Sequence, residues 1–580
     1  MAIRLWGALG VIACLLAAPA FAQQVPPLAP RLPEVPATSQ VQPPVIRPVA
    51  PAARISLPQV PAGAQAPAQA KTLFFVLTGL DIDGEFPELA EERAKLLAPY
   101  IGKRISVAEL FELANKLQQA YVNAGYPLAR VVTLPQEIGK SARVKLKVID
   151  GFVERIDAEA LPWQVRGRVL DVLKRLIRKT HLTQAELERQ LLIAGDTPGL
   201  ALNSIFGAGN DIGGSLLIVT GRYRPVSASL YGDNAVPKSF RTWQAVSSFS
   251  LNSVAGLGEQ LTVQISGYPD ETFHTAHALR RYMSGTLTVP LGTDSVRAEL
   301  YATNGRTTPN VDPIFATQGH FDRGYFKLAG DAIKRRDRVL SFNARFEATD
   351  ERVDTLAFVP SFPLSEDRTR VVRASFEGLE RWREAGMTFS YSGTFSQGVT
   401  GLGARTIDDA SFLLPLSRAG ADADFFKADG RFDIYQSLPM DFFWSLAVSG
   451  QYPFNKPMLT SEQFDITGSK ALSGFTSGAL PGDRAWVARG EFGYTYAPIS
   501  VMTWTPYAFA SYGERILVNP TIVEFPRLAA VNYGGGFRVS LAPSPEAPDL
   551  YGFIEWSHRQ VAVDSRLNGD RVFAGIVLRY

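Results

Sequence analysis

The chain has 580 residues, a net charge of +3 and 20% charged residues. The near balance of charge gives no global field that would favour nucleic acid or an acidic substrate. The hydrophobic content of 46% excludes a chain that is disordered throughout. At about 100–200 residues per domain, this length allows several domains.

Residues 1–22 have the pattern of a secretory signal peptide. Arg4 precedes a short apolar run, and residues 20–22 (Ala-Phe-Ala) form the small-x-small pattern that a signal peptidase cleaves. The only cysteine, Cys14, lies in this segment, and a lipoprotein modified at Cys14 is the alternative interpretation. We expect an exported mature chain that starts near Gln23 and has no disulfide.

Residues 23–70 are rich in proline and alanine, which predicts a polyproline-like linker. A periplasmic spacer is the main interpretation, and docking to a partner or to peptidoglycan is the alternative. The segment offers no clear helical run that would plug a pore.

Residues 71–152 predict a small α/β unit. A strand opens it at residues 72–78, and Ser106 with Glu109 forms a capping box at the start of an amphipathic helix. Two further strands are expected before residue 152.

Residues 153–223 predict a second unit of the same kind. Thr183 and Glu186 form another capping box, and two strands close the unit. One helix of this unit carries a basic face, which we interpret as a solvated surface because the aromatic residues of a nucleic-acid site are missing. Its members are Arg166, Arg168, Lys174, Arg175, Arg178 and Lys179.

Residues 224–580 alternate apolar and polar side chains in segments of about ten residues, the length of a transmembrane β-strand. In one segment Leu261, Val263 and Ile265 alternate with Thr262, Gln264 and Ser266. The chain ends on an aromatic residue, Tyr580, at the end of such a segment. We expect a closed antiparallel transmembrane barrel of about 16 strands, although twelve or eighteen would fit the length. The residues expected to face its lumen include Arg297, Glu299, Arg345, Glu347 and Arg538.

Several motifs resemble one family, the outer-membrane transporters of two-partner secretion (TpsB, the haemolysin secretion/activation family), in the superfamily that includes BamA. In the two α/β units the matching residues are Gly125, Tyr126, Pro135, Gln136, Gly151, Pro198 and Gly199. The resemblance implies that residues 71–152 and 153–223 are POTRA domains 1 and 2. Together with the barrel, this gives an α+β periplasmic region followed by an antiparallel β-barrel.

The resemblance also implies a long extracellular loop that folds back into the lumen. Its motif corresponds to Ser473, Gly474, Phe475, Gly482, Asp483 and Arg484, and the partner motif on the barrel wall to Phe509, Ser511 and Gly513. The family pairs an arginine of the loop with an aspartate of the wall, whereas this chain has Ser473 and Ser511 there. Two serines at these positions can still share a hydrogen bond worth about 1 kcal/mol, and we expect a less firmly anchored loop. The alternative is that the alignment of this chain with the family's motifs is shifted.

The resemblance implies a pore in the outer membrane that captures an unfolded partner protein through its periplasmic domains and secretes it. The cargo would be a TpsA-like adhesin, haemolysin or toxin. The other expected partners are outer-membrane lipid and, during biogenesis, periplasmic chaperones and the barrel-assembly machinery, with no nucleic acid. A BamA-like insertase and a passive porin remain alternatives. We expect no enzymatic activity and no cofactor. We also expect no metal site, because His274 and His277 have no suitably spaced carboxylates.

Overall fold

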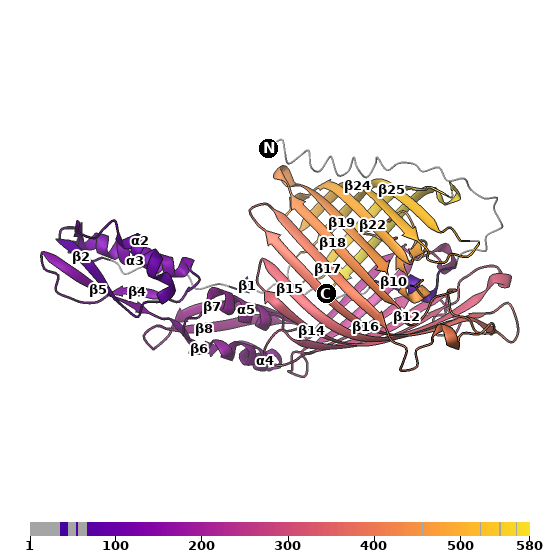
Figure 1. Ribbon diagram of the computed structural model, residues 1–580, viewed down its shortest axis with the longest axis horizontal. Coiled ribbons are helices and arrows are strands. Elements are labelled where there is room, and N and C mark those ends of the chain that lie inside the picture. Colours follow the sequence, from indigo (N-terminus) through magenta and orange to yellow (C-terminus); the bar gives the residue numbers. More distant parts are fainter. Residues whose placement is uncertain are drawn as a thin grey trace.

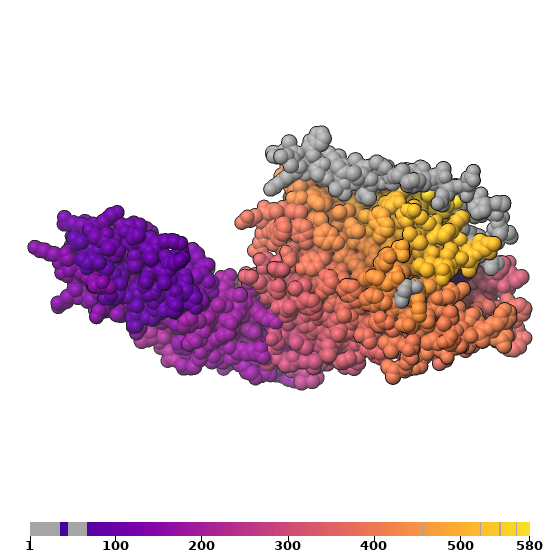
Figure 2. Space-filling model, in the orientation of Figure 1, coloured from indigo at the N-terminus to yellow at the C-terminus, as the bar shows by residue number. Residues whose placement is uncertain are grey.

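The computed structural model describes residues 35–44, 54–55, 66–454, 456–522, 524–543, 547–563 and 565–580, so the predicted signal peptide lies outside it. Two small α/β units precede a large barrel (Figure 1). The units project from one end of the barrel and give the molecule an elongated shape (Figure 2). We call this end proximal and the opposite end distal. Among the described residues, no helix is long and apolar enough to cross a membrane.

The first unit packs two helices against a four-stranded sheet of order β3-β2-β5-β4. The predicted capping box is confirmed, since the Ser106 hydroxyl accepts a hydrogen bond of 3.1 Å from the Glu109 N–H. The helix α2 and the strand β3 were not predicted from the sequence. The elements are β2 (Phe74–Asp83), η3 (Pro87–Leu89), α2 (Ala90–Leu97), β3 (Arg104–Ser106), α3 (Val107–Asn123), β4 (Arg130–Thr133) and β5 (Ser141–Ile149), preceded by η2 (Ala68–Lys71).

The second unit has a four-stranded sheet of order β1-β7-β8-β6. The capping box predicted at Thr183 is also confirmed. Its edge strand β1 (Arg54–Ile55) comes from the proline-rich segment and pairs in parallel with β7. The other elements are β6 (Phe152–Asp157), α4 (Trp163–Leu173), η4 (Lys174–Leu176), α5 (Gln184–Gly195), β7 (Leu200–Ala208) and β8 (Gly214–Tyr223).

The barrel is closed by pairing of its last strand with its first, and it has the predicted 16 antiparallel strands if β22 and β23, separated by Thr495, are taken as one. The strands on one side are long, reaching 21 residues in β16 against 8 in β9. The strands are β9 (Val226–Asp233), β10 (Gln244–Asn252), β11 (Gln260–Gly267), β12 (Arg280–Pro290), β13 (Arg297–Thr307), β14 (Thr317–Lys334), β15 (Arg338–Thr355), β16 (Phe362–Trp382), β17 (Met387–Gly398), β18 (Phe426–Ser437), β19 (Phe442–Pro453), β22 (Arg484–Tyr494), β23 (Tyr496–Ile499), β24 (Met502–Ile516), β25 (Arg527–Leu541), β26 (Asp549–Val561) and β27 (Gly569–Arg579).

Short elements lie in the connections and in the N-terminal segment. They are η1 (Thr38–Val41), η5 (Lys238–Phe240), η6 (Pro313–Phe315), η7 (Ile407–Asp409), η8 (Pro439–Asp441), η9 (Thr460–Glu462), β20 (Phe464–Asp465), β21 (Pro481–Gly482) and η10 (Ser565–Leu567).

The two faces of the barrel wall follow the predicted alternation. On β11, Val263 is 44% exposed on the outer face, whereas Gln264 is 6% exposed and Ser266 is 1% exposed. Because side chains alternate along a strand, the same pattern gives an apolar outside and a polar inside.

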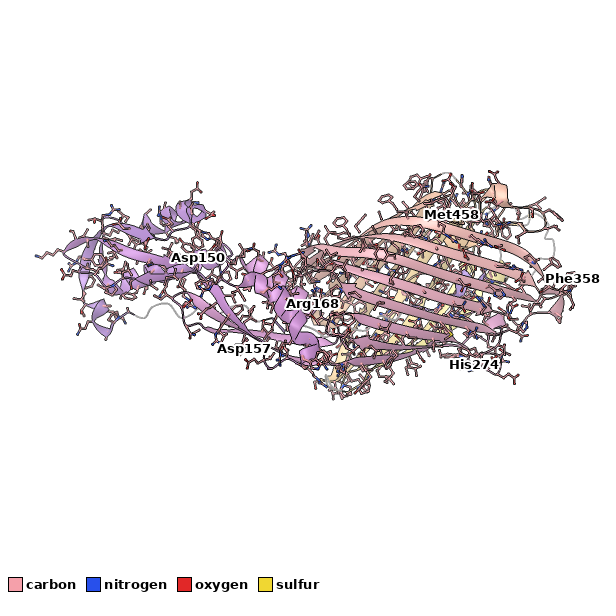
Figure 3. The ribbon with its side chains drawn as sticks, turned by 90° about the horizontal axis from the view of Figure 1, so that it is seen from below. Asp150, Asp157, Arg168, His274, Phe358 and Met458 are labelled. Carbon is pink, nitrogen blue, oxygen red and sulfur yellow. The ribbon has the colours of Figure 1, made fainter. Side chains whose placement is uncertain are left out.

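Ion pairs attach the second unit to the proximal turns of the barrel. Arg189 donates to Asp294 at 2.7 Å, and this hydrogen bond holds the pKa of the Asp294 carboxyl below its usual value. Arg168 on α4 donates to the Gly292 carbonyl, and Figure 3 shows it where the unit meets the barrel. Arg175 also approaches Asp294, at 3.7 Å. The prediction of a wholly solvated basic face is therefore wrong for Arg168, which the barrel turn partly covers, whereas Arg175 remains exposed.

Candidate functional site: the barrel lumen and its two occupants

The lumen contains cavities lined by paired charges. One cavity of about 600 Å³ is lined by Arg297, Glu299, Arg345 and Glu347, and another of about 550 Å³ by Arg538. The prediction that these five side chains face the lumen is therefore confirmed. The charges neutralise one another locally, as where Arg538 contacts Glu491 at 2.9 Å.

Residues 456–483 form a loop that enters the lumen, and a buried carboxylate fixes its first part. Glu462 is 2% exposed. It accepts from the Arg373 guanidinium at 2.7 Å and pairs with the Lys427 ammonium at 2.8 Å. Glu347 on β15 binds the same arginine at 2.8 Å. A buried carboxylate is tolerated when it is paired and hydrogen-bonded in this way.

Asp483 fixes the end of the loop, and its side chain is fully buried. It accepts the backbone N–H of Met458 at 3.0 Å and that of Val518 at 2.7 Å. It also accepts from the side chains of Gln463, at 3.1 Å, and Arg418, at 3.4 Å. One carboxylate thus joins the two ends of the loop to the neighbouring distal loop.

Ser473 lies at the loop tip and is 1% exposed. Its hydroxyl accepts from Arg489 at 2.9 Å and from Asn532 at 3.2 Å, and it donates to the Glu555 carboxylate. The Ser511 hydroxyl has no hydrogen-bond partner within the described part of the chain. The expected Ser473–Ser511 hydrogen bond is therefore wrong, because Ser473 is already engaged by a stronger, charged set.

Two arginines from the barrel wall hold the main chain of the tip. Arg559 donates to the Gly474 carbonyl at 2.8 Å, and Arg571 donates to the Ser473 carbonyl at 3.0 Å and to that of Phe475. The wall therefore supplies the cations and the loop supplies the acceptors. This is the reverse of the family's arrangement, in which the loop supplies an arginine and the wall an aspartate. The expectation of a less firmly anchored loop does not fit these contacts.

The remaining loop residues pack closely. Phe475 is 4% exposed, beneath the Arg559 guanidinium at 5.2 Å. A Cβ on Gly474 would lie 3.2 Å from the Asn532 Cβ, and one on Gly482 would lie 2.7 Å from the Arg515 Cβ. These glycines allow the loop to approach the wall.

The wall motif lies beside this loop. A Cβ on Gly513 would lie 3.2 Å from Leu472 of the loop. The Arg489 guanidinium covers the Phe509 ring at 3.9 Å. Arg484 is exposed, and its guanidinium stacks on the Tyr452 ring at 4.3 Å. The predicted motif residues thus gather around the loop except for Arg484.

Three residues of the POTRA motif in the first unit, Gly125, Tyr126 and Gln136, make hydrogen bonds or ring contacts. Gly125 has a φ of 95°, and its carbonyl accepts from the Gln184 N–H at 2.7 Å, which joins the two units. Tyr126 packs edge-on to Phe86 at 4.9 Å. Gln136 exchanges hydrogen bonds with the Lys145 backbone at 2.9 and 2.8 Å. The neighbouring Pro135 is exposed.

Three more motif residues lie where another segment of the chain comes close to their backbone. A Cβ on Gly151 would lie 2.1 Å from the Leu128 carbonyl oxygen. Gly199 has a φ of 80°, and a Cβ added to it would lie 2.3 Å from the Arg224 carbonyl oxygen. The Pro198 carbonyl accepts from the Ser253 hydroxyl at 3.0 Å, which links unit 2 to the barrel.

Tyr580 takes part in barrel closure. Its N–H donates to the Ala228 carbonyl at 2.8 Å, and its carbonyl accepts from the Ala228 N–H at 3.0 Å. These two bonds extend the pairing of β27 with β9.

The second occupant of the barrel is residues 35–44, which include the 3₁₀ turn η1. Thr38 contacts Thr307 of β13, with 2.7 Å between the hydroxyl oxygens, and the Ser39 N–H donates to Glu351 of β15 at 2.7 Å. Val41 is fully buried with Val236, Phe240 and Leu279 near the distal end. The interpretation as a periplasmic spacer is wrong for these residues, because strands and distal loops of the barrel surround them.

Among the described residues, no group of three or more His, Cys, Asp or Glu side chains is placed to hold a metal ion. His274 lies at the distal end of the barrel (Figure 3). His277 approaches Gln318 at 3.5 Å.

The closed barrel with an apolar outside and a charged lumen defines the class as a transmembrane β-barrel. The model of the haemolysin secretion/activation protein ShlB/FhaC/HecB family matches residues 213–517, more than half of the chain. The model of the ShlB-type POTRA domain matches residues 75–151. The chain belongs to this family of outer-membrane barrels, and its N-terminal units lie in the periplasm. The proximal end is therefore periplasmic, and the resemblance inferred from the motifs is confirmed.

Two relatives are similar in sequence to this chain, and one solved structure has a similar fold. A heme/hemopexin transporter protein HuxB from Haemophilus influenzae is 21% identical over 440 residues, 73% of each chain. HuxB from another strain of this organism is 26% identical over 181 residues, which are 30% of this chain and only 32% of that protein. The structure of CdiB from Escherichia coli has the same fold, with a TM-score of 0.65 at 16% identity over 90% of this chain and 92% of that chain.

Proposed function

We propose that this protein exports an unfolded partner protein across the outer membrane by two-partner secretion. Residues 71–152 and 153–223 serve as POTRA domains that capture the partner, and residues 224–580 form the pore. The relatives are named transporters. The exported partner of this chain is a secreted adhesin, haemolysin, haem-binding protein or toxin. We infer that export needs neither an enzymatic step nor a cofactor in this chain.

The observation that carries this proposal is the edge of β7. Arg54 and Ile55 add a parallel strand to this edge, opposite Asn203 and Ser204. An edge strand offers unpaired backbone N–H and C=O groups, so it accepts extended chains with little demand on their sequence. A partner that emerges unfolded into the periplasm has the conformation that such an edge binds.

The lumen favours protein export over passive diffusion. A loop and the N-terminal segment both occupy it, whereas a porin requires an open aqueous channel. Two folded units ahead of the barrel would also have no use in a passive porin.

Site-specific photo-crosslinking tests the capture step in cells that produce this protein together with a secreted partner protein. A crosslinker at Ile205, 53% exposed on β7, is expected to trap the partner, whereas one at Trp163, 66% exposed on α4, is expected to trap little. Deletion of residues 72–222 should then abolish export while the barrel still assembles. Normal export after this deletion would contradict the capture role.

A further inference from the structure

The outer face of strands β12 to β16 changes from apolar to charged near its distal edge. On β15, the exposed Phe346 shares this face with Asp350 and Arg352, which are also exposed. Residues 339–349 lie between Asp350 and the exposed Arg338 at the proximal end of the strand. This segment has the length of a strand that crosses a bilayer, about 9–11 residues. Asp350 and Arg352 therefore lie at the surface of the outer leaflet.

Arginines on the neighbouring strands continue this charged edge. Arg281 of β12 lies directly opposite Arg306 of β13. His320 of β14 lies opposite both Arg306 and Arg352. Arg368 of β16 lies one row closer to the apolar band. We call the four arginines, 281, 306, 352 and 368, the arginine row. Side-chain alternation places it on the outer face, which it shares with the exposed residues Met283, Leu300, Phe326, Phe346 and Val372.

Acidic neighbours leave part of the arginine row available. Arg368 contacts Glu366 at 2.6 Å, and its side chain is still 50% exposed. Arg352 contacts Asp354 at 2.8 Å and is 47% exposed. Because a guanidinium group has five N–H donors, each of these arginines can bind a further acceptor on its outer side. Phosphate is the acceptor that matches this planar group best, since it takes two parallel hydrogen bonds.

A hollow of about 650 Å³ in the outer face adjoins the arginine row on its proximal side. It exists because small residues lie opposite one another on four neighbouring strands. These residues are Gly285, Ala302, Gly324 and Ala348. The next outward row is bulky and apolar, and it consists of Leu287, Leu300, Phe326 and Phe346. Charged groups, a hollow and an apolar surface thus follow one another in the order of a phosphorylated headgroup and its acyl chains.

The distal edge of strands β17 to β22 has a different composition. Exposed aromatic side chains lie there, as in the girdle that transmembrane barrels place at the membrane surface. They include Phe395, Tyr452 and Trp486. The exposed Arg484 at this edge stacks on the Tyr452 ring at 4.3 Å. On strands β12 to β16, arginines occupy the position of this girdle.

We propose that the arginine row and the adjoining hollow bind lipopolysaccharide, the phosphorylated and multiply acylated glycolipid of the outer leaflet, through its lipid A part. The arginine row binds the phosphates, and the hollow receives an acyl chain. The row extends over five strands, about 19 Å at the usual strand spacing. This width exceeds that of one phosphate and suits a headgroup with phosphates at both ends of a disaccharide. The site lies outside the pore and does not depend on the export function.

Binding of lipid A to the full-length protein in detergent micelles tests the arginine row, with native mass spectrometry as the measurement. Arg368→Gln should raise the Kd of bisphosphorylated lipid A about tenfold, as expected for the loss of charge-assisted hydrogen bonds. Arg484→Gln is the matched control, because it removes an exposed arginine at the same end of the barrel but outside the row. Its Kd should not change. Dephosphorylated lipid A is the second probe, and it should bind both variants and the parent protein equally.

Gly285→Leu tests the hollow without altering any charge. A Cβ on Gly285 has no other atom within 4 Å, so the new side chain fills the hollow without a clash. We expect a severalfold rise in the Kd of lipid A. Ala344→Leu, on the outer face of β15 but outside the hollow, should leave the Kd unchanged.

Three results would overturn the site. One is an equal effect of Arg368→Gln and Arg484→Gln, which would indicate attraction by overall charge. The second is an unchanged Kd with Gly285→Leu. The third concerns phosphatidylglycerol, which has one phosphate and two acyl chains: it should bind the parent protein more weakly than lipid A, and equally tight binding would exclude lipopolysaccharide as the preferred lipid.

Discussion

The lumen holds two segments of the same chain that are fixed in opposite ways. The loop of residues 456–483 contributes its own side chains, Glu462, Asp483 and Ser473, to buried ionic and polar networks. The segment of residues 35–44 makes its hydrogen bonds with the wall largely through carbonyl and N–H groups, and the Thr38 hydroxyl and the buried Val41 side chain add side-chain contacts. Contacts to side chains select one occupant, whereas contacts to the main chain accept many. The loop therefore has the character of a fixed part of the pore, and the segment that of a replaceable one.

The largest effect on this comparison is expected from Glu462→Ala. It leaves Arg373 and Lys427 buried without their shared carboxylate, and such losses cost about 3–5 kcal/mol. Urea unfolding in lipid vesicles should show this fall in the free energy of unfolding. Glu462→Gln, which keeps one acceptor oxygen, should cost less. If Glu462→Ala matches the parent protein, the loop is not fixed at this point.

A smaller loss, about 2 kcal/mol, is expected from Ser473→Arg, since the new cation lies beside Arg489 and Arg571. Adding Ser511→Asp should recover about 1 kcal/mol if the two positions couple. A double-mutant cycle on the free energy of unfolding measures this coupling. A double variant that unfolds or abolishes export, while each single variant is mild, would show that the sites do not pair.

Val41→Asp is expected to change conductance more than stability. Burying a charge among Val236, Phe240 and Leu279 disfavours the seated segment by about 1–3 kcal/mol, so the open fraction should rise about tenfold. Single-channel recording provides the measurement, with Val41→Leu as the control. An unchanged open fraction would mean that the segment does not obstruct the pore.

The smallest effect is expected from Ser511→Ala. Its hydroxyl is buried without a hydrogen-bond partner in the described part of the chain, so its removal should change the free energy of unfolding by about 0.5 kcal/mol or less. Urea unfolding in lipid vesicles, as for Glu462→Ala, measures this change in the free energy of unfolding. A loss above about 1 kcal/mol would indicate a hydrogen bond that supports the loop.

The sequence predicted those features that depend on local periodicity. Alternation on β11 separates Val263 from Gln264, and the capping box of Ser106 marks the start of α3. The occupants of the lumen could not be predicted in this way. Residues 35–44 have no apolar period, and many of their contacts with the wall are made by main-chain atoms that every residue shares. The arginines around Ser473 come from β22, β26 and β27, and only the closed barrel brings them together.

Disulfide tethering of each occupant provides the most direct test of the central contrast. Thr38→Cys with Thr307→Cys should tether the segment, because the two hydroxyl oxygens are 2.7 Å apart. Gly474→Cys with Asn532→Cys should tether the loop, because the two Cβ positions are 3.2 Å apart. Under oxidising conditions, we expect the first pair to stop export until a reductant is added, and the second to leave export unchanged. Normal export through the oxidised Thr38→Cys/Thr307→Cys protein would contradict the account.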